Sequence, residues 1–122
     1  MHGDLKAANI LFDGKAVKLT DFGDSRILGR KTKPIEVEEE SGISFFDIKG
    51  SILWMAPEVL VGKPVGTRSD IWSLGQTMIE LCTAENPWPQ IKNFNDLLTK
   101  ITQREVPQVP EHLSPVARDF IL

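Results

Sequence analysis

Apolar residues recur along this chain in two spacings, and each spacing predicts a different kind of element. Short apolar runs predict strands over 9–12 and 16–20, and the Asp13-Gly14 pair between them is a strong signal for a β-hairpin turn. A helical spacing follows over 69–83, where apolar residues return every three or four positions. The pattern therefore predicts a small hairpin followed by helices.

The helix predicted over 69–83 is apolar on several sides, which is typical of a helix buried among others. Thr67 or Ser69 is expected to cap its start, because a short polar side chain can accept a backbone hydrogen bond there. The prolines of 85–89 are expected to stop it.

Two further helices are predicted towards the end of the chain. The first is amphipathic, with Asn93 as its cap, and its apolar positions are Phe94, Leu97, Leu98 and Ile101. The second begins after Ser114 as N-cap, with Pro115 at its first position. The expected fold class is mainly α with a small β-hairpin.

Residues 24–50 follow neither a helical nor a strand spacing, and the segment contains glycines, a proline and an acidic run at 36–40. Loops longer than about 15 residues are uncommon in compact domains and are usually functional or mobile. A disordered insertion is the alternative interpretation of this segment.

Composition places the chain among ordinary globular domains, with 122 residues, 41% apolar, 25% charged and a net charge of −3. The basic residues are scattered, so the sequence favours neither nucleic acid nor an anionic membrane as a partner. It contains no apolar run of about 18 residues that would predict a transmembrane helix. The single cysteine, Cys82, fits a reducing compartment, and we expect a cytoplasmic location.

Candidate chemistry gathers at the start of the chain. Asp4, Asn9 and Asp21 supply oxygen ligands on two loops that flank the predicted hairpin, and such ligands suit Mg²⁺. Lys6 could neutralise a phosphate during its transfer, and Asp4 could accept a hydroxyl proton. Taken singly, an aspartate near a turn is better explained as a cap, and an asparagine beside a strand as a turn former.

Four segments give these residues a context: "HGDLKAAN", "DFG", "GSILWMAPEV" and "SDIWSLG" occur in the order typical of the eukaryotic protein kinase catalytic domain. The chain resembles the C-terminal lobe of a protein kinase over essentially all of its length. Within that family it looks most like the mitogen-activated protein kinase kinase kinase and Ste20-related group.

The resemblance implies catalytic roles. Asp4 matches the aspartate that orients the substrate hydroxyl and takes its proton, and Lys6 matches the lysine that steadies the γ-phosphate. Ser51 stands where kinases place a hydroxyl that bonds to both of them. Asn9 and Asp21 match the two residues that bind Mg²⁺.

The resemblance also implies positions around ATP. Leu11 matches the apolar residue beneath the adenine, and Thr20 lines the back of that pocket. His2 and Phe22, the latter followed by Gly23 of the "DFG" motif, match stacked members of an internal hydrophobic spine.

Glu58 and Asp70 match two structural carboxylates of kinases. Glu58 closes the activation segment and is expected to be unpaired, because the later arginine that pairs with it in kinases is not in the sequence. Asp70 is expected to be buried and to hold the backbone of the catalytic loop.

On this resemblance the chain divides into a catalytic loop at 1–9, a β-hairpin at 9–20, an activation segment at 21–58 and a helical subdomain at 59–122. The kinase-like α+β fold would be incomplete, without its N-terminal ATP-binding lobe. Met1 is therefore expected to be an internal residue of the working protein, and the chain alone is expected to catalyse negligibly.

The chain contains no tyrosine, so any phosphorylation of the activation segment must fall on serine or threonine, with Thr32, Ser41 and Ser44 as candidate sites. Gly3 occupies the position where most kinases regulated in this way have an arginine that grips the phosphate. Arg26 matches a second basic position. The hypothesis is that phosphorylation acts weakly, or through Arg26 alone.

The resemblance implies a serine/threonine protein kinase that uses ATP and Mg²⁺ on a protein substrate, of which a downstream kinase is one candidate. Lys6, two residues after Asp4, favours the serine/threonine type, although "KAAN" partly resembles the "RAAN" of tyrosine kinases. One alternative is a truncated pseudokinase that acts as a binding module. Another is a small-molecule phosphotransferase of the aminoglycoside kinase type, although these lack "DFG" with a long loop and an "APE" segment.

Overall fold

The computed structural model describes residues 1–25 and 51–122. The first part contains an antiparallel sheet of two strands, β1 (Ile10–Phe12) and β2 (Val17–Leu19). The register pairs Ile10 with Leu19 and Phe12 with Val17, so the turn spans residues 13–16 and includes the Asp13-Gly14 pair, and the predicted hairpin is confirmed.

The strands are shorter than predicted because their outer residues serve other purposes. Asn9 belongs to a short 3-10 turn, η1 (Ala7–Asn9), and its side chain points towards the preceding loop. Thr20 leaves the strand but still donates its backbone N–H to the carbonyl of Asn9 at 3.0 Å. The base of the hairpin is therefore joined to the loop that precedes it.

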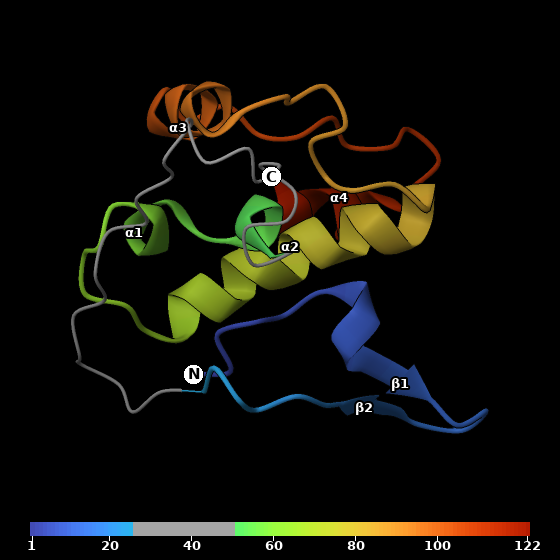
Figure 1. The fold of residues 1–122 in the computed structure, drawn as a ribbon. Helices are drawn as coiled ribbons and strands as arrows, with labels where there is room; N and C mark the ends of the chain where they lie inside the picture. The colour runs from blue at the N-terminus through green and yellow to red at the C-terminus, as the bar shows by residue number, and fades with distance from the viewer. Residues whose placement is uncertain (26–50) are drawn as a thin grey trace.

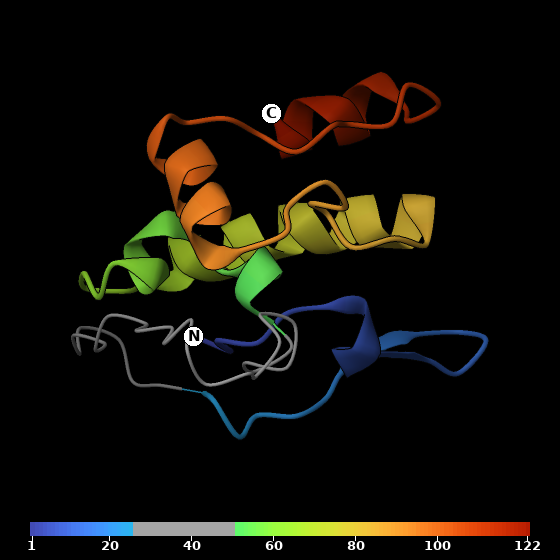
Figure 2. The ribbon, with the colours of Figure 1, turned by 45° about the horizontal axis from the view of Figure 1, so that its top comes forward.

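Four helices follow in the described part of the chain: α1 (Pro57–Leu60), α2 (Thr67–Thr83), α3 (Phe94–Thr102) and α4 (Pro115–Ile121). A further 3-10 turn, η3 (Ile52–Trp54), comes before α1. Helix α2 runs through the middle of the molecule, with the N-terminal loop and hairpin on one side and α3 and α4 on the other (Figures 1 and 2). A mainly α fold with a small β-hairpin is thus confirmed.

Two of the predicted helix caps are present. The Asn93 side chain accepts a hydrogen bond from the Asp96 backbone N–H at 2.9 Å, and Ser114 Oγ accepts one from Ala117 N–H at 3.2 Å. Each bond satisfies a donor in the first turn of its helix.

The cap predicted for α2 is wrong. Its N-cap is Gly66, and the helix start has no side-chain cap. Thr67 is already helical, and Ser69 instead donates its hydroxyl to Glu58 Oε1 at 2.5 Å. The hydroxyl that could have capped the helix is thus used in a long-range contact.

The main apolar core lies between η3, α1, α3 and the segment just before α3, with Trp72 of α2 packed against it. Its fully buried members are Ile52, Leu53, Leu60, Trp88, Ile91, Leu97 and Ile101. Burying these side chains is the main source of stability for the helical part.

Helix α2 is less buried than its apolar pattern predicts. Ile71 and Leu81 are 54% and 60% exposed, and Trp72 and Met78 are half-buried. Gln76 and Thr77, by contrast, are fully buried. The described residues pack against α2 on two sides but leave part of its surface uncovered, and this explains the difference.

Candidate active site

The N-terminal loop is fixed to α2 through its backbone. The carboxylate of Asp70, in the first turn of α2, accepts the N–H of His2 at 2.7 Å and the N–H of Gly3 at 2.9 Å. Asp70 is half-buried rather than buried as expected, but it makes the expected contacts with the loop backbone. These hydrogen bonds are charge-assisted, because the acceptor is a carboxylate. They fix the backbone of the two residues that precede Asp4, and so they set the position of Asp4 itself.

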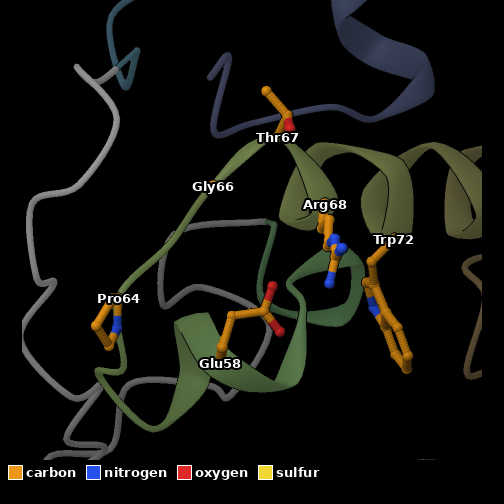
Figure 3. A pocket seen from close by; sticks show the side chains of 6 residues that line it. All are labelled: Glu58, Pro64, Gly66, Thr67, Arg68 and Trp72. Atoms are coloured by element: carbon orange, nitrogen blue, oxygen red, sulfur yellow. The ribbon is translucent and has the colours of Figure 1, made fainter.

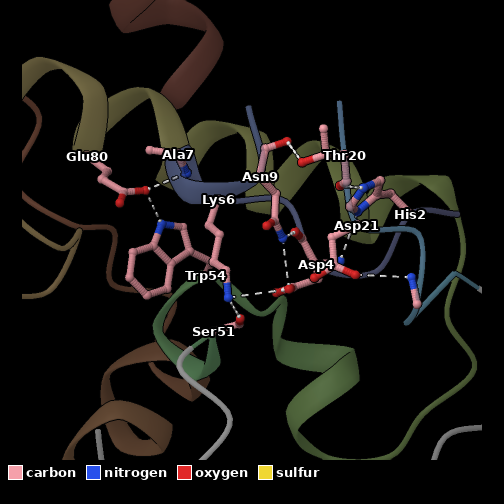
Figure 4. Close-up of polar contacts among 11 residues, drawn as sticks. His2, Asp4, Lys6, Ala7, Asn9, Thr20, Asp21, Ser51, Trp54 and Glu80 are labelled. Atoms are coloured by element: carbon pink, nitrogen blue, oxygen red, sulfur yellow. Dashed lines mark hydrogen bonds and ion pairs between the residues drawn. The ribbon is translucent and has the colours of Figure 1, made fainter. Parts of the chain in front are cut away.

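Four polar side chains converge just after this point (Figure 4). Lys6 Nζ lies 3.3 Å from Asp4 Oδ2 and 2.6 Å from Ser51 Oγ. The Asn9 amide donates to the same Asp4 oxygen at 2.9 Å and to the Asp4 carbonyl at 2.9 Å. The structure therefore brings together Asp4, Lys6, Asn9 and Ser51, although in the sequence Ser51 lies 45 residues after Lys6.

The two oxygens of the Asp4 carboxylate differ in their contacts. Oδ2 receives both Lys6 and Asn9, whereas Oδ1 is buried and has no hydrogen-bond partner among the described residues. Buried polar atoms without a partner are rare and call for an explanation. Oδ1 is therefore the acceptor of this carboxylate that no described residue uses.

Ser51 is buried and contacts Lys6, as expected, but its expected second bond to Asp4 is not made in the described part of the chain. Lys6 lies between them and contacts both. Three residues of the catalytic group are thus connected through the lysine.

The Asn9 side chain uses its nitrogen for Asp4, and this leaves its carbonyl oxygen as the atom it can offer to a metal ion. The backbone carbonyl of Asn9 accepts both the backbone N–H and the hydroxyl of Thr20. Asp21 is the next residue after Thr20, so its backbone lies beside the loop that carries Asn9. Asp21 is exposed, and its backbone has the positive φ of 59°. Its Oδ1 accepts the N–H of Gly23 at 3.3 Å.

Within residues 1–25 and 51–122, no group of three His, Cys, Asp or Glu side chains could hold a metal ion. Asn9 and Asp21 alone supply two oxygens. That set fits Mg²⁺, which takes its remaining ligands from phosphates and water, and it does not fit a structural metal that needs a full protein shell.

His2 joins the loop to the "DFG" segment. Its ring Nδ1 accepts the N–H of Asp4 at 3.2 Å, so Nε2 carries the proton and donates to the Thr20 carbonyl at 2.9 Å. Its ring lies 4.8 Å from that of Phe22, centroid to centroid, at an interplanar angle of 59°. The two predicted spine residues are in contact.

Of the remaining predicted residues, Leu11 and Glu58 lie in the described part of the chain. Leu11 is 55% exposed on β1. Glu58 is not unpaired as expected, because Ser69 donates to it. Arg26, Thr32, Ser41 and Ser44 lie outside the described residues.

A separate open pocket lies at the start of α2, away from the catalytic group (Figure 3). The carboxylate of Glu58 and the guanidinium of Arg68 both point into it (Figure 3). It is lined by Glu58, Pro64, Gly66, Thr67, Arg68 and Trp72, so none of the predicted catalytic residues contributes to it.

The sequence analysis did not identify Glu80 and Trp54 as parts of the site. Glu80 Oε2 accepts the backbone N–H of Ala7 at 2.9 Å and the indole N–H of Trp54 at 2.9 Å (Figure 4). Glu80 and Trp54 fall inside the quoted motifs or beside them, but neither has a spacing that indicates this contact.

Residues 1–122 match the protein kinase domain, and the chain belongs to the protein kinase family. It is 38% identical over 122 residues to mitogen-activated protein kinase kinase kinase 3 of Mus musculus, covering 99% of this chain and 18% of that protein. It is 40% identical over 124 residues to mitogen-activated protein kinase kinase kinase 3 of Arabidopsis thaliana, covering 100% and 18%.

A third relative is mitogen-activated protein kinase kinase kinase A of Dictyostelium discoideum, 39% identical over 125 residues, covering 99% of this chain and 12% of that protein. The chain thus spans less than a fifth of the length of these relatives. Among the described residues, no helix has both the length and the apolar character needed to cross a membrane.

Proposed function

We propose that this chain is the C-terminal lobe of a serine/threonine protein kinase that transfers the γ-phosphate of ATP to a protein hydroxyl. The observation that carries this proposal is the Asp4 carboxylate, with Oδ2 held by Lys6 and Asn9 and Oδ1 buried and free. The proposed division into catalytic loop 1–9, hairpin 9–20, activation segment 21–58 and helical subdomain 59–122 accompanies it.

The proposed reaction uses the four converging side chains as follows. A serine or threonine hydroxyl of the substrate donates a hydrogen bond to Asp4 Oδ1, and its proton passes to that oxygen as the hydroxyl oxygen bonds to the γ-phosphorus. The bond between the γ-phosphorus and the bridging oxygen breaks, and ADP leaves with that electron pair. Lys6 stands between Asp4 and Ser51, where its charge can stabilise the transferred phosphoryl group.

Asn9 and Asp21 are the residues that would hold Mg²⁺, which when bound neutralises phosphate charge. Leu11 and Thr20 are proposed to face the adenine end of ATP, and His2, Phe22 and Gly23 to keep Asp21 in place. The names of the relatives favour another kinase as the protein substrate. We propose the cytoplasm as its location, because the reaction consumes ATP.

The test uses a chimera: the kinase domain of mouse mitogen-activated protein kinase kinase kinase 3, with residues 1–122 of this chain in place of the matching segment. The mouse kinase domain supplies the parts of a kinase domain that lie outside residues 1–122 of this chain. We expect phosphorylation of serine or threonine in a protein substrate. Asp4→Asn should lower kcat by about 10²–10⁴-fold, because the amide cannot take the proton.

Asp119→Asn, an exposed aspartate on α4, is the matched control and should leave the rate unchanged. Both variants should melt at the same temperature as the unsubstituted chimera. Full activity in Asp4→Asn would refute the assignment of the base. A folded chimera that transfers no phosphate would instead support a non-catalytic binding module.

A further inference from the structure

Glu80 lies near the end of α2, where one of its oxygens receives two donors from different segments. The backbone N–H of Ala7 belongs to the residue directly after Lys6, and the indole of Trp54 lies three residues after Ser51. Lys6 and Ser51 are themselves joined at 2.6 Å. The two segments therefore meet twice, once through the lysine and once through Glu80.

The position of Glu80 on the helix complements that of Asp70. The two carboxylates are ten residues apart on α2, which corresponds to about 15 Å along the axis. Asp70 holds the backbone at His2 and Gly3, and Glu80 holds it at Ala7. The stretch that carries Asp4 and Lys6 is thus fixed to one rigid helix at both of its ends.

The second donor to Glu80, the indole N–H of Trp54, belongs to a side chain that is held in place. It is packed against the apolar core, and its backbone carbonyl accepts the hydroxyl of Ser73 on α2 at 2.8 Å. The indole cannot swing away from Glu80 without disturbing that packing. Glu80 therefore relates the catalytic loop to a fixed point of the helical part.

We propose that Glu80 is a positioning residue, which acts by tying the Ala7 backbone to Trp54 and so keeps Lys6 in place between Asp4 and Ser51. This proposal rests on the proposed function, since Lys6 acts on the transferred phosphate. Glu80 itself touches no reacting atom. Its effect passes through the lysine.

The chimera described above tests this role. Glu80→Ala should lower kcat by about tenfold, while KM for ATP changes little. The loss should be smaller than the full worth of two hydrogen bonds to a charged group, because Lys6 keeps its contacts with Asp4 and Ser51. Glu80→Gln keeps an oxygen that can accept both donors, so it should retain most of the activity. Glu111→Ala, an exposed glutamate, is the control and should leave kcat unchanged.

A double-mutant cycle with Lys6→Ala separates positioning from a general structural role. If Glu80 acts through Lys6, Glu80→Ala should have little further effect once the lysine is gone. If the two effects multiply, Glu80 does not position Lys6, and the proposal is overturned. Equal losses in Glu80→Ala and Glu80→Gln would also overturn it, because charge rather than the hydrogen bonds would then matter.

Hydrogen exchange of the chimera gives a measurement that does not depend on activity. The Ala7 amide and the Trp54 indole should exchange faster in Glu80→Ala than in Glu80→Gln. Unchanged exchange would overturn the tie itself. A chimera that lacks phosphotransfer but shows these changes would refute the proposed function and leave the tie intact.

Discussion

Gly3 in the N-terminal loop has no room for a side chain. Its φ is +87°, and a Cβ placed on it would lie 2.8 Å from the backbone carbonyl oxygen of Asp24. Because that oxygen belongs to the backbone, it cannot move aside as a flexible side chain would. The glycine thus permits the close approach of the loop and the segment after the "DFG" motif.

We expect Gly3→Ala to destabilise the molecule through both backbone strain and overpacking, and Gly14→Ala through backbone strain alone. Gly14 has the same φ of +87° but nothing within 4 Å of its Cβ position. Both substitutions cost about 1–2 kcal/mol of backbone strain, and the overpacking at Gly3 adds about 1–3 kcal/mol. The free energies of unfolding of the two chimera variants in urea would measure the difference.

Equal losses at Gly3 and Gly14 would show that the contact with Asp24 has no cost. Gly3→Arg carries the same Cβ, so we expect it to be destabilised rather than to gain the phosphate-binding arginine typical of kinases. The absence of that arginine is therefore consistent with the geometry of this loop.

At the residue scale, the sequence identified side chains whose spacing belongs to a motif, and missed those joined only by the fold. Asp4, Lys6 and Asn9 lie within six residues, and the structure brings them together. Glu80 bonds to a residue 73 positions away and to another 26 positions away. Such pairings depend on how α2 packs, which no local pattern encodes.

At the scale of elements, the hairpin turn is a small unit held by one carboxylate. Asp13 Oδ2 lies 2.9 Å from Lys18 Nζ, and Asp13 Oδ1 accepts the N–H groups of Lys15 and Ala16. The Lys18 ammonium, followed by these backbone N–H groups, holds the pKa of Asp13 below its usual range. The ionised form is therefore favoured in the folded turn.

This lowered pKa predicts how the hairpin responds to acid. Its contribution is fully present above the pKa of the unfolded chain, about 3.9, and is lost as the pH falls through the lower folded-state pKa. The effect should be small, because the pair is exposed to solvent. The protection factor of the Ala16 amide, which removes the intrinsic pH dependence of exchange, should fall through this acid range as Asp13 is protonated.

Asp13→Asn separates the carboxylate from the rest of the turn. The amide oxygen can still accept the backbone N–H groups but cannot titrate, so exchange at Ala16 should lose its dependence on the state of this side chain. The same pH profile in wild type and Asp13→Asn would mean that another group controls the turn.

Helix boundaries were predicted well where a local side chain sets them. Asn93 and Ser114 cap α3 and α4 as their positions indicate. The start of α2 and the whole of α1 (Pro57–Leu60) were not predicted, because Ser69 bonds to Glu58 across two elements and α1 is a single turn held by packing. Tertiary contacts decide these cases.

At the scale of the whole molecule, α2 is the element to which the other parts are attached. Its Asp70 and Glu80 hold the N-terminal loop on one side, and Trp72 faces the core on the other. The apolar pattern predicted a helix buried among others; α2 does lie between the hairpin and the other helices (Figure 1), but Ile71 and Leu81 on it are exposed. The sequence could not predict which residues of α2 are exposed, because a helix that is covered on all sides has the same spacing of apolar residues.

The isolated 122-residue chain should be prone to association, since large apolar side chains remain exposed in several regions, among them the hairpin and α2. On the hairpin, Phe12 and Val17 are 70% and 67% exposed, and on α2 Leu81 is 60% exposed. A sheet of two strands is also marginal without further packing, and exposed apolar surface favours self-association.

We expect the isolated chain to bind a hydrophobic dye strongly and to elute as oligomers in size-exclusion chromatography, and the chimera to do neither. Replacing Phe12 and Val17 with threonine should reduce both effects, because threonine keeps the strand preference and removes apolar surface. A monomeric isolated chain with a cooperative melt and no dye binding would mean that these surfaces are stable in water as they stand.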